Sequence, residues 1–142
     1  MLKRFLRLLR RIPVAYQVAA FVAGRRAVVR GESMLPALLP GERILFDVLA
    51  YRIDPPRAGD IVLATHLGRP GITMIKRVAG APGDEIEGRT LAAGEYWLLG
   101  DTPAFSTDSR ELGPFRRADI AGRAWLVYWP SNAVRRVDQP AP

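Results

Sequence analysis

The strongest constraint on the fold is a series of short apolar runs, separated by glycine and proline, that follows Ala27. Runs of about five residues have the length of β-strands and are shorter than typical helices. We expect strands over Ile44–Leu49, Asp60–Thr65, Thr73–Ala79, Glu95–Leu99 and Ala124–Trp129. Turn signals lie between them at Pro40-Gly41, Asp54-Pro55-Pro56, Arg69-Pro70-Gly71 and Ala81-Pro82-Gly83-Asp84. The pattern predicts a mainly β fold, a single antiparallel sheet or barrel-like domain.

The positive charge is concentrated before this β region. The formal net charge is +7, yet residues 27–142 hold as many acids as cations, so the excess comes from residues 1–26. Apolar residues recur there at helical spacing, with cations between them, at Leu2, Phe5, Leu8, Leu9 and Ile12. This predicts an N-terminal basic amphipathic helix that Pro13 ends or kinks. We divide the chain into a membrane-associating segment (1–26), a β domain (27–137) and a frayed tail (138–142).

The charge-free stretch that follows, Ile12–Gly24, is too short for an ordinary membrane span. Thirteen helical residues are roughly 20 Å long, against a hydrocarbon core of roughly 30 Å. We therefore favour a helix that lies on an anionic membrane surface, over a tilted anchor or a helix packed on its own domain. A secretory signal fits less well, because Val22-Ala23-Gly24 is a weak cleavage site. Since one segment carries the excess charge, we expect no nucleic-acid partner.

Composition narrows the chemistry. The chain has no cysteine, which excludes disulfides, thiolate nucleophiles and cysteine metal sites. Its single histidine, His66, argues against a zinc site, and we expect neither metal nor cofactor. Arginine stays charged in proteins, so a base near neutral pH has to be a carboxylate or a deprotonated lysine. Only two of the 21 cationic residues are lysines, Lys3 and Lys76.

Lys76 lies in a predicted strand, where the period of two places it on the same face as Met74 and Val78. That face is either exposed, with Ile75 marking the core, or buried. In a chain that otherwise uses arginine, a retained lysine suggests that removal of its proton matters. Its pKa would have to fall about three units, roughly 4 kcal/mol, which burial can supply. A neutral amine could then activate a serine hydroxyl.

Two further segments carry polar groups. Ser33, in Gly31-Glu32-Ser33-Met34-Leu35-Pro36, is either a helix N-cap or an exposed nucleophile. The segment from Gly100 to Arg110 places Ser106 close to Asp108 and Arg110. It is either a turn cluster with a surface ion pair or a rigid loop that presents Ser106 to an amine.

Taken in order, these segments resemble the motifs of the type I signal peptidases, membrane-bound serine peptidases with a Ser/Lys dyad. The match runs from Gly31 to Trp129 through four boxes. They are Gly31-Glu32-Ser33-Met34-Leu35-Pro36, Gly59-Asp60-Ile61-Val62, Lys76-Arg77-Val78-Ala79-Gly80-Ala81-Pro82-Gly83-Asp84, and Gly100-Asp101 through Ser106-x-Asp108-Ser109-Arg110. The chain lacks the large inserted β domain of longer members, so it resembles the small ones.

The resemblance implies site roles. Ser33 would be the nucleophile and its backbone N–H an oxyanion-hole donor, and Lys76 would be the general base. Ser106 would orient the lysine amine, Asp108 and Arg110 would form a supporting ion pair, and Met34 would line the substrate pocket.

Three positions depart from the family pattern. Gly31 replaces a serine found in some members, which leaves the second oxyanion donor open. Ala37 replaces a threonine and Thr102 an asparagine, and for these two we expect shifted loop contacts and retained activity.

The resemblance also implies the substrates: exported precursors, cleaved after small residues at the first and third positions before the scissile bond. The catalytic domain would lie on the extracytoplasmic side of a cell or organellar inner membrane. Two alternatives stay open, a maturation peptidase with one or a few client proteins and a non-catalytic membrane-surface binding module. The sequence leaves the oligomeric state undetermined.

Overall fold

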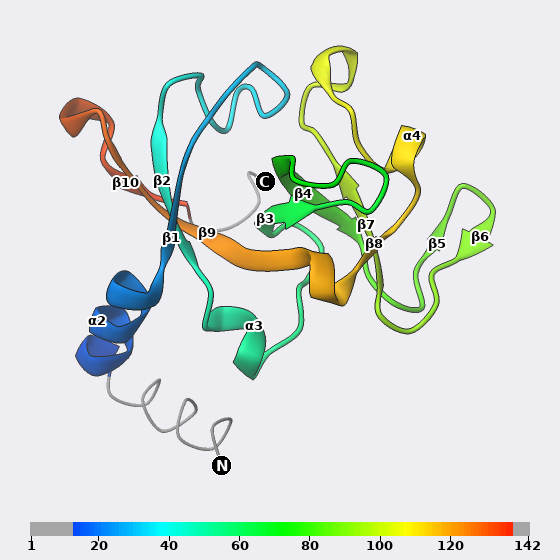
Figure 1. Cartoon of the computed structure of the whole chain (residues 1–142), viewed down its shortest axis with the longest axis horizontal. Helices are drawn as coiled ribbons and strands as arrows, with labels where there is room; N and C mark the ends of the chain where they lie inside the picture. The colour runs from blue at the N-terminus through cyan, green and yellow to red at the C-terminus, as the bar shows by residue number, and fades with distance from the viewer. Residues whose placement is uncertain (1–12, 138–142) are drawn as a thin grey trace.

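The computed structural model describes residues 13–137, and most of its strands belong to one curved antiparallel sheet (Figure 1). The helical elements are α2 (Pro13–Ala23), α3 (Ala50–Ile53), η1 (Pro103–Phe105), α4 (Ser109–Leu112), η2 (Arg117–Asp119) and η3 (Ser131–Ala133). The strands are β1 (Arg25–Val28), β2 (Arg43–Asp47), β3 (Ile61–Thr65), β4 (Thr73–Gly80), β5 (Glu85–Ile86), β6 (Arg89–Thr90), β7 (Glu95–Leu99), β8 (Phe115–Arg116), β9 (Ile120–Trp129) and β10 (Arg135–Arg136).

The predicted mainly β fold is confirmed. The five expected strands correspond to β2, β3, β4, β7 and β9. β2 ends at Asp47, earlier than expected, because its carboxylate accepts the backbone N–H groups of Leu49 and Ala50 and turns the chain. β9 starts earlier than expected, at Ile120. Gly122 interrupts its apolar pattern, and a Cβ there would lie 3.0 Å from a backbone oxygen of the neighbouring β2.

Sequence reasoning missed β1 and the short strands β5, β6, β8 and β10. β1 begins with Arg25-Arg26, which resemble the polar end of the preceding helix, and it lies at the edge of the sheet, where charge is tolerated. The predicted division at residue 26 falls inside this strand and stays a prediction.

The strand order β1-β2-β9-β3-β4-β7-β8 puts three strands between β1 and β4 in the sheet, and β10 pairs with β9. Even so, β1 and β4 line one cavity, so the sheet has to curve strongly. Pairing shifts register in the β2–β9, β3–β9 and β4–β7 pairs. Such irregularities bend a strand and increase its twist, and they supply the curvature that closes the sheet around the cavity.

The interior is divided by β3, which is buried on both faces. Ile61 and Leu63 pack into one apolar cluster, whereas Val62 and Ala64 pack into the other. A strand covered on both sides has no polar face, which explains why its sequence is a continuous apolar run.

The predicted basic helix over residues 1–12 lies outside the described residues, as does the predicted tail 138–142. The described helix, α2, begins at Pro13, a residue that suits the first turn. It packs on β2 through the fully buried Ala20, and the Tyr16 hydroxyl donates a 2.6 Å hydrogen bond to Asp47. Among residues 13–137, no helix has the length and apolar character needed to cross a membrane.

The other face of α2 is apolar and exposed. Its four large exposed side chains are Val14, Val18, Phe21 and Val22. They recur at helical spacing and are followed directly by Arg25 and Arg26, with the Arg26 guanidinium 5.3 Å from the centre of the Phe21 ring. Figure 1 shows α2 at one end of the molecule and the β5–β6 hairpin at the other.

Gly24 tests the packing of α2. A Cβ at this position would lie 2.6 Å from Leu45 Cδ1 and 2.7 Å from the carbonyl oxygen of Ala20. We expect Gly24→Ala to lower the free energy of unfolding by about 1–3 kcal/mol, the usual cost of overpacking, as measured by urea denaturation. The control is Ala23→Ser at the neighbouring exposed position. Equal stability of the two variants would contradict this packing.

Candidate active site

Strand β4 places Lys76 in the interior. Met74, Lys76 and Val78 share a face, as predicted, and are 8%, 5% and 1% exposed. The alternative of a solvent-exposed face is therefore wrong. The amine is buried between two apolar neighbours on its own strand, which disfavours its charged form.

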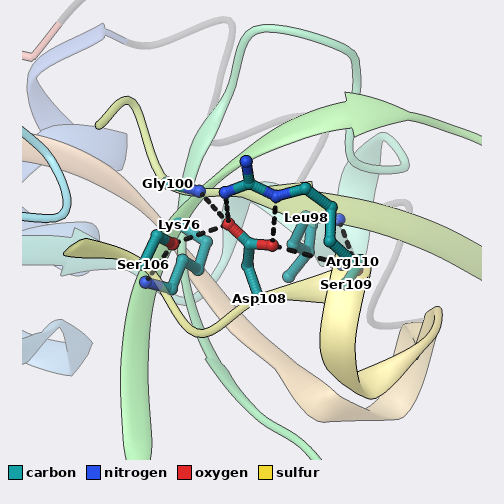
Figure 2. A network of polar contacts seen from close by, with 7 residues as sticks. All are labelled: Lys76, Leu98, Gly100, Ser106, Asp108, Ser109 and Arg110. Atoms are coloured by element: carbon teal, nitrogen blue, oxygen red, sulfur yellow. Dashed lines mark hydrogen bonds and ion pairs between the residues drawn. The ribbon is translucent and has the colours of Figure 1, made fainter. Parts of the chain in front are cut away.

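A chain of hydrogen bonds starts at the lysine amine (Figure 2). Lys76 Nζ donates to Ser106 Oγ over 3.1 Å, and Ser106 Oγ donates to Asp108 Oδ2 over 2.6 Å. The hydroxyl has a single hydrogen, which is directed to Asp108, so it presents lone pairs to Lys76. Lys76 therefore has to donate in this contact, and the lone pair of a neutral amine is left to point elsewhere.

Asp108 is fully buried and saturated with donors. It accepts from the Gly100 backbone N–H at 3.0 Å, and Arg110 Nε and Nη2 donate to its two oxygens at 2.9 and 2.6 Å. Burial alone would raise the pKa of Asp108. The hydrogen bonds from Arg110, Ser106 and Gly100 outweigh it and hold this pKa well below its usual range. Asp108 also caps the N-terminus of α4.

Three influences act on the pKa of Lys76. Burial is the largest and lowers it, the Asp108 carboxylate raises it, and the Arg110 guanidinium lowers it. The net direction is downward from the ordinary lysine value of 10.5. The site therefore favours the neutral amine at lower pH than free lysine does, although a carboxylate lies close by.

Ser33 lies in the loop between β1 and β2, and no helix begins at this residue, so the N-cap interpretation is wrong. Within residues 13–137, neither the hydroxyl nor the backbone N–H of Ser33 forms a hydrogen bond. Gly31 has a φ of +72°, a backbone conformation that L side chains rarely adopt. Glycine suits this turn better than the serine that the family pattern allows.

Two residues of the last box contact the Ser33 loop, and sequence reasoning assigned neither of them to the site. Thr102 donates its backbone N–H to the Ser33 carbonyl over 2.9 Å and its hydroxyl to the Leu35 carbonyl over 2.8 Å. A Cβ on Gly100 would overlap Ser106 Oγ and lie 2.9 Å from the Ser33 carbonyl oxygen. The position of both residues in the last box was the one sequence signal that could have pointed to them. Their roles depend on tertiary contacts, which the sequence does not show.

A second ion pair ties three of the boxes together. Arg77 Nε and Nη2 each lie 2.8 Å from an oxygen of Asp101, and Arg77 Nη1 donates to the Gly59 carbonyl over 2.9 Å. The lysine box, the Gly59-Asp60 box and the last box are therefore fixed relative to one another by one guanidinium.

The predicted residues meet around a cavity of about 310 Å³. Its walls are formed by Ala27, Val28, Val29, Arg30, Ser33, Met34, Leu63, Thr73, Met74, Ile75 and Lys76. Ser33, Met34 and Lys76 thus line one space, and Ser106, Asp108 and Arg110 are joined to Lys76 by the hydrogen-bond chain. His66 is bonded elsewhere, to Pro114 and Gly68. Residues 13–137 contain no His, Asp and Glu cluster suited to a metal.

Comparison with known proteins agrees with this geometry. The family model described as signal peptidase, peptidase S26, matches residues 2–91 and 87–129. The chain belongs to this family. It is 29% identical to the signal peptidase I of Leptolyngbya laminosa, over 91% of this chain and 80% of that protein. It is 33% identical to the mitochondrial inner membrane protease subunit 1 of Schizosaccharomyces pombe, over 90% of this chain and 96% of that protein.

A third relative is the mitochondrial ATP-independent inner membrane protease subunit 1b of Arabidopsis thaliana, 35% identical over 75% of this chain and 71% of that protein. Family membership makes the chain a serine endopeptidase of the signal peptidase type, and the non-catalytic binding module is not supported.

The substitution Asp108→Asn in this signal peptidase tests two roles of Asp108, the orientation of Lys76 through Ser106 and the effect of its charge on the pKa of Lys76. We expect kcat for peptide cleavage to fall about ten- to hundredfold, because an amide nitrogen facing Ser106 would reverse its hydroxyl and misdirect Lys76. The Asp108 charge raises the pKa of Lys76, so its loss should also move the rising, acidic limb of the pH profile to lower pH.

The measurement is kcat and KM against pH, with circular dichroism to verify folding. Asp101→Asn is the control, because it breaks the neighbouring ion pair with Arg77 without touching Ser106. An unchanged kcat, or a limb that moves to higher pH, would contradict the assignment.

Proposed function

We propose that this signal peptidase cleaves exported precursor proteins with Ser33 as nucleophile and Lys76 as general base. The observation that carries the proposal is the shared cavity, in which a serine with a free hydroxyl lies with a buried lysine whose pKa is lowered. The hydrogen bond from Lys76 to Ser106 leaves the lone pair of the neutral amine available for Ser33.

The reaction follows from these groups. Ser33 Oγ attacks the scissile carbonyl carbon while its proton passes to Lys76 Nζ, and a carbon–oxygen bond forms. The carbonyl oxygen becomes an oxyanion, which accepts a hydrogen bond from the free backbone N–H of Ser33. The Lys76 ammonium then protonates the leaving amine as the carbon–nitrogen bond breaks. Lys76, neutral again, takes a proton from water as the water oxygen attacks the acyl-enzyme carbonyl carbon. The bond from that carbon to Ser33 Oγ then breaks, Lys76 returns the proton to Ser33 Oγ, and the product acid leaves.

Strand edges around the cavity suit an extended peptide. β4 pairs with β3 from Thr73 to Arg77, but it pairs with β7 only from Arg77 onward. Residues 73–76 therefore have a strand on one side only, as β1 does at the edge of the sheet. A precursor segment that pairs with these edges would direct alternate side chains into the cavity. The small volume and the buried Met34 favour small residues at the first and third positions before the scissile bond.

The same site suits a general signal peptidase or a maturation peptidase with few clients, and the relatives include both a signal peptidase I and a mitochondrial inner membrane protease subunit. We favour the general activity, and a survey of precursors that accumulate in depleted cells would separate the two.

We also propose that residues 1–26 hold the enzyme on an anionic membrane surface, with the catalytic domain on the extracytoplasmic side. The exposed apolar face of α2 and the adjacent Arg25 and Arg26 support this proposal, because apolar and basic signals bind membranes better together than singly.

The dyad is tested by removing each partner. We expect Ser33→Ala and Lys76→Arg to reduce cleavage of a precursor peptide with alanine at the first and third positions by at least about a thousandfold. In the wild type, the rate should rise with pH as Lys76 loses its proton, and the rise should occur below the ordinary lysine pKa of 10.5. Thermal unfolding of Ser33→Ala verifies the fold. Activity retained in Lys76→Arg would refute the mechanism, since arginine does not act as the base.

The membrane contact is tested without deleting α2, because α2 packs on β2. We expect Val18→Ser with Phe21→Ser to weaken binding to phosphatidylglycerol vesicles by about tenfold or more, since two half-exposed apolar side chains are lost. Co-sedimentation measures the binding. The control pair is Leu67→Ser with Val134→Ser, two exposed apolar residues outside α2. Equal losses from both pairs would show that α2 is not the contact.

A further inference from the structure

Arg30 is the feature of the cavity that the proposed mechanism does not use. It lies three residues before Ser33 and forms part of the wall. Among the described residues of that wall, the only other charged side chain is Lys76, which reacts as the neutral amine, and none carries a carboxylate. Arg30 is therefore the permanent charge at the place where the precursor lies.

No described residue neutralises this charge. Within residues 13–137, Arg30 forms no ion pair, whereas Arg77 and Arg110 are each held by an aspartate. Its side chain is exposed at the cavity, so the guanidinium stays hydrated until a substrate approaches. An unpaired arginine in this position attracts a carboxylate and repels a cation on the bound chain.

The alternation of exposed and buried residues from Arg26 to Arg30 indicates which substrate residues Arg30 would contact. Arg26, Val28 and Arg30 alternate with Ala27 and Val29, and the first set is exposed while the second is at least partly buried. A peptide extended along this edge has the same alternation. With small residues inward at the first and third positions before the scissile bond, the second residue before it and the first residue after it face outward.

We infer that Arg30 is a specificity residue, which favours precursors with aspartate or glutamate at these outward-facing positions and disfavours lysine or arginine there. This inference rests on the proposed function. Opposite charges on neighbouring strands change affinity by about two- to fivefold, and like charges reduce it similarly. The combined preference for glutamate over lysine is therefore about four- to twenty-fivefold, and it weakens as salt screens the exposed charges.

The test uses the full-length protein and matched peptides that differ at one residue. Glutamate, glutamine or lysine is placed at the second position before the bond and, in a second series, at the first position after it. The wild type should show the glutamate-over-lysine preference in kcat/KM in at least one series. Arg30→Gln should lose it, and Arg30→Glu should reverse it. Each preference is expressed relative to the same enzyme's kcat/KM for the glutamine peptide, so a change in overall activity from altering the cavity wall does not count as a change of preference.

Arg26→Gln is the matched control, since Arg26, in β1, belongs to the same alternating exposed set as Arg30 but lies outside the cavity wall, and it should keep the preference. A preference that persists in Arg30→Gln, or that is lost equally in Arg26→Gln, overturns the role of Arg30. Failure of the wild type to cleave the glutamine peptide overturns the proposed function and this role with it.

Discussion

The geometry of the site depends on one buried carboxylate. A fully buried aspartate is costly unless its charge is paired and its lone pairs are satisfied. Asp108 meets this condition only when the Gly100 backbone, the Ser106 hydroxyl and the Arg110 guanidinium all reach it at once. These groups come from the end of β7, the loop after η1 and the start of α4. Satisfying Asp108 therefore sets the conformation of the whole segment and directs the single hydrogen of Ser106 away from Lys76.

A second constraint is the curvature of the sheet, because the groups of the cavity come from strands that are not neighbours. β1 leads into the loop that carries Ser33, and β4 carries Lys76. A flat sheet would hold β1 and β4 apart with three strands between them, whereas the irregular pairings of β9 and β4 bend it. Thr102 then fixes the remaining freedom of the Ser33 loop through the Ser33 and Leu35 carbonyls. The serine is thus positioned by backbone contacts, while its hydroxyl and N–H stay free.

The parts of this arrangement that follow from local patterns could be predicted from the sequence. The shared face of Met74, Lys76 and Val78 follows from strand periodicity, although its burial does not, and the five main strands follow from apolar runs between turns. Contacts that depend on tertiary approach could not be predicted. Nothing local distinguishes Gly100 as the residue against which Ser106 packs, or Thr102 as the residue that donates to the Ser33 and Leu35 carbonyls. β1 was missed because Arg25-Arg26 match the charged segment before them, and an edge strand has little apolar signature.

The unequal use of lysine and arginine gives the site a constant electrostatic environment. Across the range in which Lys76 loses its proton, every arginine remains charged, and Asp108 remains ionised because hydrogen bonds hold its pKa low. Arg110 therefore lowers the pKa of Lys76, and Asp108 raises it, by amounts that do not change with pH in that range. Lysine neighbours would titrate together with Lys76 and spread its loss of charge over a wider range. An arginine-rich chain with one buried lysine confines the titration of the site to the residue that transfers the proton.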